Sequence, residues 1–259
     1  HTRPHRAKVV YTQEGKIFLG HKLSKNPSSR VKLLTKTLKS PVEEFKNCMK
    51  KKIEGILEIQ RGKILPSINF GDAQNLPMGD ATVDLIVTSP PYAANAIDYM
   101  RAHKFSLVWM GYPIDILGEK RGEYIGGEAV TGISYEQLPA KSAQKVNQIA
   151  NTDKKKGRVL HRYYSEITRT LKELFRVLKP GKAAIIVIGN STMRGIDTQS
   201  HIALKEIGQI VGFEVPKIGT RNLDRNRRMM PASANVNTDS QIQQRMHEEY
   251  VIGFYKPSV

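Results

Sequence analysis

The 259 residues are enough for one sizeable domain and contain no apolar run long enough to cross a membrane. Lys and Arg number 41 against 24 Asp and Glu, and the resulting net charge of +17 favours a polyanionic partner, nucleic acid or acidic membrane on charge alone. One cysteine, Cys48, excludes an internal disulfide framework and indicates a reducing compartment, so we expect a cytoplasmic protein.

Residues 1–66 are strongly basic and carry +11 of the net charge of +17. The runs 7–12 and 16–21 flank a short turn that contains Gly15, which predicts a β-hairpin. Its basic side chains are consistent both with phosphate contacts and with an ordinary solvated edge. Ser40 and Pro41 then predict a helix start. An apolar stripe follows at helical spacing, made of Phe45, Met49, Ile53, Ile56 and Leu57.

The central feature of the sequence is an apolar run at 83–87 that ends in a polar turn with two prolines. The run is β-branched and leucine-rich, as in a parallel strand that is covered on both faces. Pro90 and Pro91 prevent the strand from continuing and hold Ser89 in a stiff turn, with Tyr92 at its end. Ligands of open parallel sheets bind beyond the carboxyl ends of the strands, so this turn is a candidate site.

The turn has the groups that methylation of an exocyclic amine requires. Such an amine is a poor nucleophile because its lone pair is delocalised into the base. The hydroxyl of Ser89 and the carbonyl of Pro90 are two acceptors that would favour a more tetrahedral nitrogen. Tyr92 offers a flat face on which a flipped base can stack. This chemistry needs neither a metal nor a covalent intermediate.

Three stretches together resemble the DNA amino-methyltransferase family, which transfers a methyl group from S-adenosylmethionine to an exocyclic amine. They are Gly71-Asp72-Ala73, then Val83-Asp84-Leu85-Ile86-Val87-Thr88-Ser89-Pro90-Pro91-Tyr92, then Asn95-Ala96-Ile97-Asp98-Tyr99 with Arg101-Ala102-His103-Lys104.

The resemblance implies that Ser89, Pro90, Pro91 and Tyr92 form the catalytic loop. A serine at the first position is commoner among enzymes that methylate N4 of cytosine, and aspartate or asparagine among those for adenine. We therefore expect methylation of cytosine N4, with adenine N6 as the alternative target. The expected biological setting is a restriction-modification system.

The resemblance also implies a cofactor site at the end of a third strand. A short strand is predicted at 67–70, and Asp72 after it would contact the adenine of S-adenosylmethionine. Ala73 and Thr88 are assigned to the same site.

Further elements follow the loop. Residues 98–110 are predicted to be helical, and 111–160 form a long insertion that is a candidate for closing over DNA. A crossover helix with Tyr164, Ile167, Leu171, Leu174, Phe175 and Leu178 on one face leads to a buried strand at 183–188. A helix near 202–211 and strands at 213–218 and 250–255 complete the pattern.

Basic residues near these elements are candidates for contact with nucleic acid. An arginine-rich loop between the last two strands combines groups that bind phosphates and read base edges. The nucleic-acid candidates are Arg101, Lys104, Arg221, Arg225, Arg227 and Arg228. His103 receives no chemical role, because the amine can lose its proton after methylation.

The resemblance implies a Rossmann-like α/β methyltransferase sheet of order 3-2-1-4-5-7-6. The chain contains nothing like the Asp-Pro-Phe-x-Gly-x-Gly loop with which the family holds the methionine part of the cofactor. We therefore expect strands 3–7 here, with strands 1–2 and the cofactor loop supplied by a missing upstream segment or by a second polypeptide.

The expected organisation is a basic hairpin and helical region at 1–66, followed by a methyltransferase core at 67–259. This core holds the insertion at 111–160 and a basic loop at 219–249. An RNA base methyltransferase, a protein-glutamine methyltransferase and a non-catalytic DNA-recognition subunit are the alternatives.

Overall fold

The computed structural model describes residues 8–11, 16–20, 35–37, 40–57, 66–93, 99–189, 191–222 and 248–258. The chain divides into two compact units, residues 1–68 and 69–259, and each is described by itself. No helix in the described ranges is both long and apolar enough to cross a membrane.

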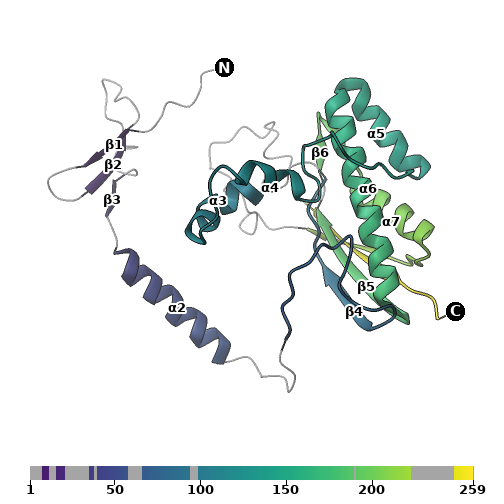
Figure 1. Ribbon diagram of the computed structural model, residues 1–259, viewed down its shortest axis with the longest axis horizontal. Coiled ribbons are helices and arrows are strands. Elements are labelled where there is room, and N and C mark those ends of the chain that lie inside the picture. The colour runs from purple at the N-terminus through teal and green to yellow at the C-terminus, as the bar shows by residue number, and fades with distance from the viewer. Residues whose placement is uncertain are drawn as a thin grey trace. The chain divides into compact units, whose positions relative to one another are not determined.

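The first unit contains the predicted hairpin (Figure 1). Strands β1 (Lys8–Tyr11) and β2 (Lys16–Gly20) pair antiparallel, which confirms the hairpin, and β3 (Thr35–Thr37) adds a third strand beside β2. Helix α2 (Pro41–Leu57) begins after Ser40, whose hydroxyl oxygen accepts a hydrogen bond from the Glu43 amide at 3.5 Å. The predicted helix start is therefore confirmed. On its apolar stripe, Phe45, Met49 and Ile53 remain exposed.

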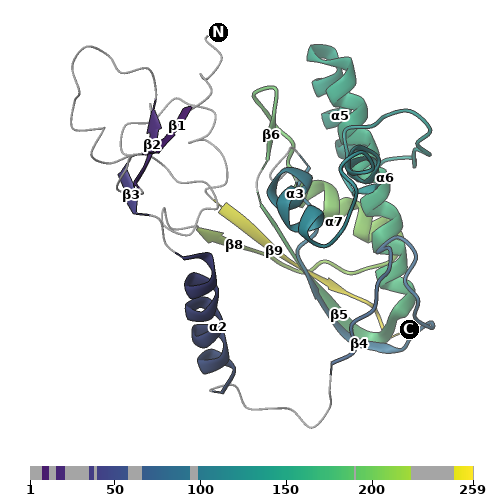
Figure 2. The same cartoon turned by 60° about the vertical axis from the view of Figure 1, so that its left-hand side comes forward.

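The second unit is built on a four-stranded mixed sheet (Figure 2). Its order is β4 (Val83–Thr88), β5 (Leu178–Gly189), β9 (Glu248–Tyr255) and β8 (Ile218–Asn222). β4 and β5 are parallel, whereas β9 runs antiparallel to both of its neighbours. This arrangement is the 4-5-7-6 half of the expected methyltransferase sheet, and the Rossmann-like fold class is confirmed.

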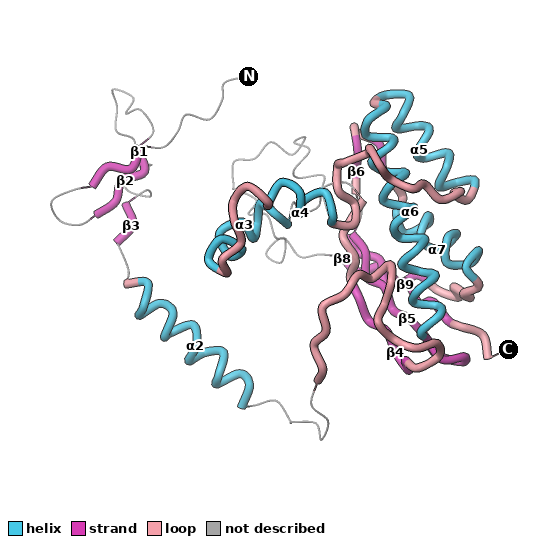
Figure 3. Tube along the Cα trace, in the orientation of Figure 1, coloured by secondary structure: helices cyan, strands magenta, loops and turns pink. Residues whose placement is uncertain are grey.

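Helices connect and cover these strands, as the tube in Figure 3 shows. The chain passes from β4 through α3 (Tyr99–Trp109), α4 (Leu117–Glu123), α5 (Ala140–Thr152) and α6 (Lys154–Val177) into β5. The short strands β6 (Thr192–Met193) and β7 (Ile196–Asp197) form a hairpin before α7 (Ser200–Val211). The insertion at 111–160 therefore contains α4, α5 and the first turns of α6.

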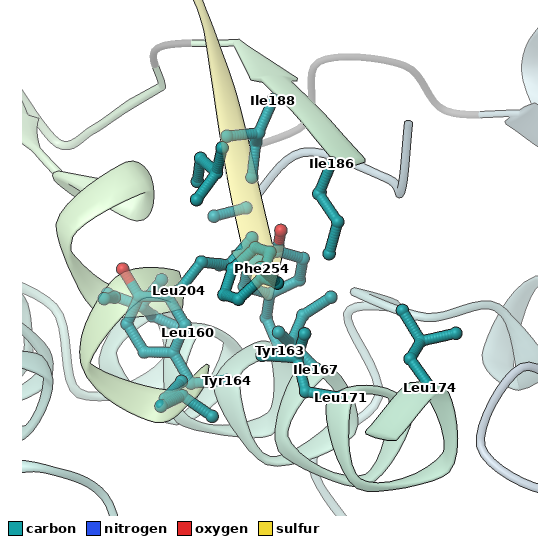
Figure 4. Close-up of a cluster of buried hydrophobic side chains, with 14 of the residues drawn as sticks. Leu160, Tyr163, Tyr164, Ile167, Leu171, Leu174, Ile186, Ile188, Leu204 and Phe254 are labelled. Carbon is teal, nitrogen blue, oxygen red and sulfur yellow. The ribbon is translucent and has the colours of Figure 1, made fainter. Parts of the chain in front are cut away.

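Helix α6 supplies one side of the hydrophobic core (Figure 4). Its predicted apolar face is buried, with Tyr164 and Leu171 fully inaccessible and Ile167 only 2% exposed. Ile188 and Phe254 of the sheet and Leu204 of α7 pack into the same cluster. Full burial of an aliphatic side chain of this size is worth about 1.5–3 kcal/mol, so this cluster fixes α6 and α7 on one face of the sheet.

Two predicted strands are placed differently in the structure. Residues 67–70 are not a strand, and Ile68 and Phe70 are almost fully exposed, because no described strand lies beside them to complete a hydrogen-bond ladder. The strand predicted at 213–218 is instead β8, which begins at Ile218. Glu214 forms an isolated antiparallel bridge with Tyr255, but Pro216 lacks an amide hydrogen and interrupts the ladder, so continuous pairing resumes only at Ile218.

The face of β4 that points away from the core is open in the described part of the chain. Leu85 and Val87 lie on the same face, two residues apart, and are 60% and 68% exposed. Ile86, on the opposite face, packs against the core. In an α/β sheet both faces of a parallel strand are normally covered, so this half of the sheet lacks a layer among the described residues.

Candidate active site

The predicted catalytic loop lies directly after the carboxyl end of β4. Thr88, the last residue of β4, pairs with Ile186 of β5. Ser89 is exposed, the following residues through Tyr92 are half-buried, and Ala93 is 2% exposed. The loop thus presents its serine to solvent while its far end is anchored in the protein.

The first anchor of the loop comes from α6. The hydroxyl of Tyr163 donates a hydrogen bond to the carbonyl oxygen of Pro91 at 2.9 Å. Tyr163 is fully buried, so its ring cannot move without disturbing the core. This contact fixes the position of Pro91 relative to α6.

The second anchor comes from the sheet itself. The hydroxyl of Tyr92 donates to Oε1 of Glu249 at 3.2 Å, and Glu249 also forms an ion pair with Arg221. A Cβ atom added to Gly189 would lie only 2.4 Å from Cε2 of Tyr92, so the ring occupies the space above this glycine. Glycine at the end of β5 is therefore required for the observed position of Tyr92.

A buried ion pair on α6 holds the neighbouring part of the insertion. Nε of Arg162 lies 2.7 Å from Oε1 of Glu166, and both side chains are almost fully buried. The guanidinium also donates to the carbonyl oxygens of Gly122, Tyr124 and Ala129, while the other oxygen of Glu166 accepts from the Gly126 amide. These contacts fix the segment 122–129 on the helix that anchors the catalytic loop.

The turn that contains Asp72, a residue assigned to the cofactor, is hydrogen-bonded to another part of α6. Oδ1 of Asp72 accepts from the Gln74 amide at 2.9 Å, and Nε of Arg169 in turn donates to the side chain of Gln74 at 2.8 Å. Arg169 follows Tyr163 by six positions, which corresponds to about 9 Å along a helix. One helix therefore positions both the Asp72 turn and the catalytic loop.

A second contact secures this segment to α6. The Leu76 amide donates to Oε2 of Glu173 at 2.8 Å. The Arg176 guanidinium, hydrogen-bonded to Glu173, lowers the pKa of that carboxyl below its usual range. Glu173 therefore stays ionised at neutral pH and remains an acceptor for the backbone of the segment.

The residues near Asp72 suit the nucleoside end of S-adenosylmethionine. Asp72 is exposed, its carboxylate can accept hydrogen bonds from a ligand, and Phe70 beside it exposes its whole ring. Ala73 is half-buried in the turn between Asp72 and Asn75, and Thr88 lies at the end of β4. These groups fit only this end of the cofactor, since the described residues include no glycine-rich loop for the methionine end.

The candidates for contact with nucleic acid are dispersed. Lys104 is exposed on α3, and Arg101 lies one turn earlier on the same helix. Arg221 is at the end of β8, where it pairs with Glu249. The predictions for Arg225, Arg227 and Arg228 fall outside the described residues.

A buried cluster of hydroxyl groups lies where β5 leads toward α7. Oγ1 of Thr198 is 2.7 Å from Oγ of Ser191 and 2.8 Å from Oγ of Ser200. The Tyr164 hydroxyl donates to the carbonyl of Thr198 at 2.9 Å, and burial raises the pKa of this tyrosine. All these groups have protein partners, so the cluster serves to join this connection to α6.

Sequence reasoning missed Tyr163, Glu249 and the role of Gly189. Gly189 carried a visible signal as a glycine at the ligand edge of a strand. Glu249 carried a weaker one, because a carboxylate directly before an apolar strand needs a partner if it is buried. Tyr163 carried none, since an aromatic residue on a buried helix face is ordinary core.

No family model matches the chain. It is 26% identical to the type II methyltransferase M.MvaI of Kocuria varians over 138 residues, which are 49% of this chain and 30% of that protein. It is also 26% identical to the type II methyltransferase M.AvaI of Nostoc sp. (strain PCC 7120) over 153 residues, 52% of this chain and 32% of that protein.

Among solved structures, PvuII DNA methyltransferase (cytosine-N4-specific) is 14% identical and covers 73% of this chain and 48% of that chain, with a TM-score of 0.39. The chain spans about a third of the length of the curated relatives that it matches. Over about half of its length the chain is similar to proteins named as type II methyltransferases.

Proposed function

We propose that this chain is the catalytic part of a DNA amino-methyltransferase that methylates the exocyclic amine of a flipped base. The observation that carries the proposal is the turn after β4. Ser89 is exposed there, while Pro91 and Tyr92 are held by residues of two other elements. A site with a solvent-facing acceptor and an anchored aromatic ring suits a base that enters from solution.

In the proposed mechanism Ser89 Oγ and the Pro90 carbonyl accept hydrogen bonds from the amine of the base. This directs the nitrogen lone pair away from the ring and toward the methyl donor. Stacking of the base on Tyr92 contributes about 1–3 kcal/mol toward holding it outside the duplex. S-adenosylmethionine, when bound, supplies an electrophilic methyl group whose carbon–sulfur bond breaks as the carbon–nitrogen bond forms. The methylated nitrogen is then cationic and releases its extra proton to water, so no strong base is needed.

The target atom in this proposal is N4 of cytosine, and its support is the serine at position 89. Adenine N6 is the alternative. The relatives named as type II methyltransferases suggest a restriction-modification context.

The cofactor would be held by Asp72, Ala73 and Thr88 together with a glycine-rich loop from outside these 259 residues. This loop would come from another segment of the same polypeptide or from a second one. The support is the chain's short span of its relatives and the face of β4 at Leu85 and Val87, which is open among the described residues. We call the assembly of this chain with the segment or polypeptide that supplies the loop the active form.

DNA would bind across the loop through basic groups that neutralise phosphates. Arg101 and Lys104 lie on α3, the first described helix after the catalytic loop, and Arg225, Arg227 and Arg228 belong to the arginine-rich segment after β8. The net charge of +17 supports a polyanionic substrate.

The test of the reaction is a methylation assay of the active form on DNA, with mass spectrometry of the product nucleosides. N4-methyldeoxycytidine is the expected product, and N6-methyldeoxyadenosine would select the alternative base. Ser89→Ala and Tyr92→Ala should abolish most activity, whereas Thr152→Ala, at an exposed position ending α5, should not. DNA binding without any methylated product would favour a non-catalytic DNA-recognition subunit. Methylation of RNA but not of DNA would identify RNA as the substrate.

The test of the cofactor site is native mass spectrometry of the purified complex combined with binding of S-adenosylmethionine. Binding only when a glycine-loop polypeptide or segment is present would support the divided site. Stoichiometric binding by these 259 residues alone would refute it.

A further inference from the structure

Gly189, Glu249 and Arg221 form one row across three adjacent strands. Gly189 of β5 is the register partner of Glu249 of β9, and Glu249 is the register partner of Arg221 of β8. The row lies at the end of β5 where the chain leaves the sheet, beside the catalytic loop. Hydrogen-bonded pairing therefore fixes the relative positions of these three backbones, as long as the sheet is intact.

Tyr92 extends over this row from the loop after β4. Its ring occupies the space above Gly189, where an added Cβ would lie 2.4 Å from Cε2 and 2.9 Å from Cδ2. Its hydroxyl reaches the second member of the row and donates to Oε1 of Glu249 at 3.2 Å. The ring is thus fixed at two points, by the glycine beneath it and by the carboxylate at its tip.

The carboxylate of Glu249 is itself held in place. The residue is 9% exposed, and a charge this buried is unfavourable unless it is paired and hydrogen-bonded. Arg221 supplies the pairing charge on Oε2, which leaves Oε1 directed at Tyr92. The Arg221 side chain as a whole is 63% exposed, so this ion pair lies at the surface of the sheet.

We propose that Glu249 and Arg221 are positioning residues of the catalytic site: Arg221 orients the Glu249 carboxylate, and Glu249 fixes the plane of the Tyr92 ring on which the flipped base stacks. The inference rests on the proposed function. It assigns Arg221 to the support of Tyr92 in place of the phosphate contact expected from its position beside the arginine-rich segment.

The first experiment is a mutant cycle on the active form with Tyr92→Phe, Glu249→Ala and the double variant. Each single variant should lower kcat roughly 10- to 100-fold with little change in KM for DNA, because a misplaced ring affects the reacting geometry more than overall binding. The double variant should be no slower than the slower single one. Losses that multiply would show that Glu249 acts independently of Tyr92 and would overturn the proposal.

Glu248→Ala is the matched control for this cycle. Glu248 precedes Glu249 on β9, its side chain leaves the opposite face of the strand, and it accepts from the Tyr250 hydroxyl at 3.1 Å. It should leave kcat unchanged. A loss equal to that of Glu249→Ala would show that damage to β9, and not the position of Tyr92, is responsible.

The second experiment separates the two roles of Arg221 by the salt dependence of DNA binding. Each phosphate contact contributes about 0.9 to the slope of log Kobs against log salt concentration. Arg221→Met should leave this slope unchanged while kcat falls. A slope reduced by about 0.9 with kcat unchanged would make Arg221 a phosphate contact and overturn its part of the proposal.

A third measurement does not depend on activity. In the 259-residue chain with isotope-labelled tyrosine rings, the Tyr92 signals are identified by their loss in Tyr92→Phe. Glu249→Ala and Arg221→Met should both shift these signals, and unshifted signals would refute the positioning role even if methylation is confirmed. If the shifts are seen but no substrate is methylated, the proposed function fails and the geometry stands.

Discussion

The hydroxyl of Tyr163 donates a 2.9 Å hydrogen bond to the carbonyl oxygen of Pro91, and this bond joins the crossover helix to the catalytic loop. Proline has no amide hydrogen with which to bind the loop to the sheet, so its carbonyl is the backbone group that remains for anchoring. The neighbouring hydroxyl, on Tyr164, donates to the carbonyl of Thr198 in the connection between β5 and α7. Adjacent residues of one helix therefore hold two different connections.

Tyr163→Phe should reduce the activity of the active form without unfolding it. The change keeps the ring volume, so the free energy of unfolding should fall by only about 0.5–1.5 kcal/mol, the net worth of one hydrogen bond. The loop loses an anchor, and kcat should fall roughly tenfold or more. Denaturant unfolding and the methylation assay measure the two effects.

Tyr164→Phe is the control at the next position. It should lower stability to a similar extent and leave kcat near its wild-type value, because Thr198 is not part of the loop. Equal losses of activity in the two variants would mean that the effect comes from the core and not from Pro91.

Gly189→Ala should displace Tyr92. The new Cβ would lie 2.4 Å from the ring, whereas in Gly253→Ala, in the same sheet, the nearest atom is Cδ1 of Ile185 at 4.0 Å. Overpacking such as that in Gly189→Ala typically destabilises a protein by about 1–3 kcal/mol. Here the clash is relieved only if the Tyr92 ring moves away from position 189. We expect Gly189→Ala to lose methylation and Gly253→Ala to retain it. A crystal structure of Gly189→Ala with Tyr92 unmoved would contradict this explanation.

Arg162→Ala should be among the most destabilising single changes in the chain. It leaves the Glu166 carboxylate buried without its charge partner and removes the donors that hold the carbonyls of Gly122 and Ala129. Breaking a buried ion pair typically costs about 3–5 kcal/mol. Arg158→Ala, one turn earlier on the exposed side of α6, should change the free energy of unfolding by less than about 0.5 kcal/mol. Similar unfolding midpoints for the two variants would refute the role given to this pair.

The start of α6 should be sensitive to acid. Asp153 caps the helix by accepting from the Lys156 amide at 3.0 Å and pairs with Arg194 at 2.7 Å. The hydrogen bond from the Lys156 amide and then that from Arg194 lower the pKa of Asp153. A carboxyl whose pKa is lowered by folding stabilises the protein above its unfolded pKa, about 3.9, and loses this effect as the pH falls through the folded value.

Asp153→Asn should therefore melt at a lower temperature than the wild type at pH 7, and the difference should shrink as the pH falls below about 4. Thermal unfolding followed by circular dichroism at a series of pH values measures it. Arg194→Met, which removes the partner charge, should show a smaller dependence of the same sign. A difference in melting temperature that stays constant down to pH 2 would contradict the lowered pKa of Asp153.

Local patterns were sufficient for much of the fold. The apolar run before Ser89 became β4, the stripe through Tyr164 and Leu171 became the buried face of α6, and Ser40 capped its helix. These features depend on backbone preferences and on the period of apolar residues within a few turns of chain. The strand predicted at 67–70 failed for the opposite reason, because a strand is completed only by a neighbour, and the described residues provide none there.

The sequence by itself determined which residues make the candidate loop, since Ser89, two prolines and Tyr92 are contiguous and their chemistry is visible in one line. Only the tertiary structure decided what holds the loop. Tyr163 lies 72 positions from Pro91, and Glu249 lies 157 positions from Tyr92. Contacts across such separations follow from helix packing and strand register, and these are set by the whole sheet and not by any local pattern.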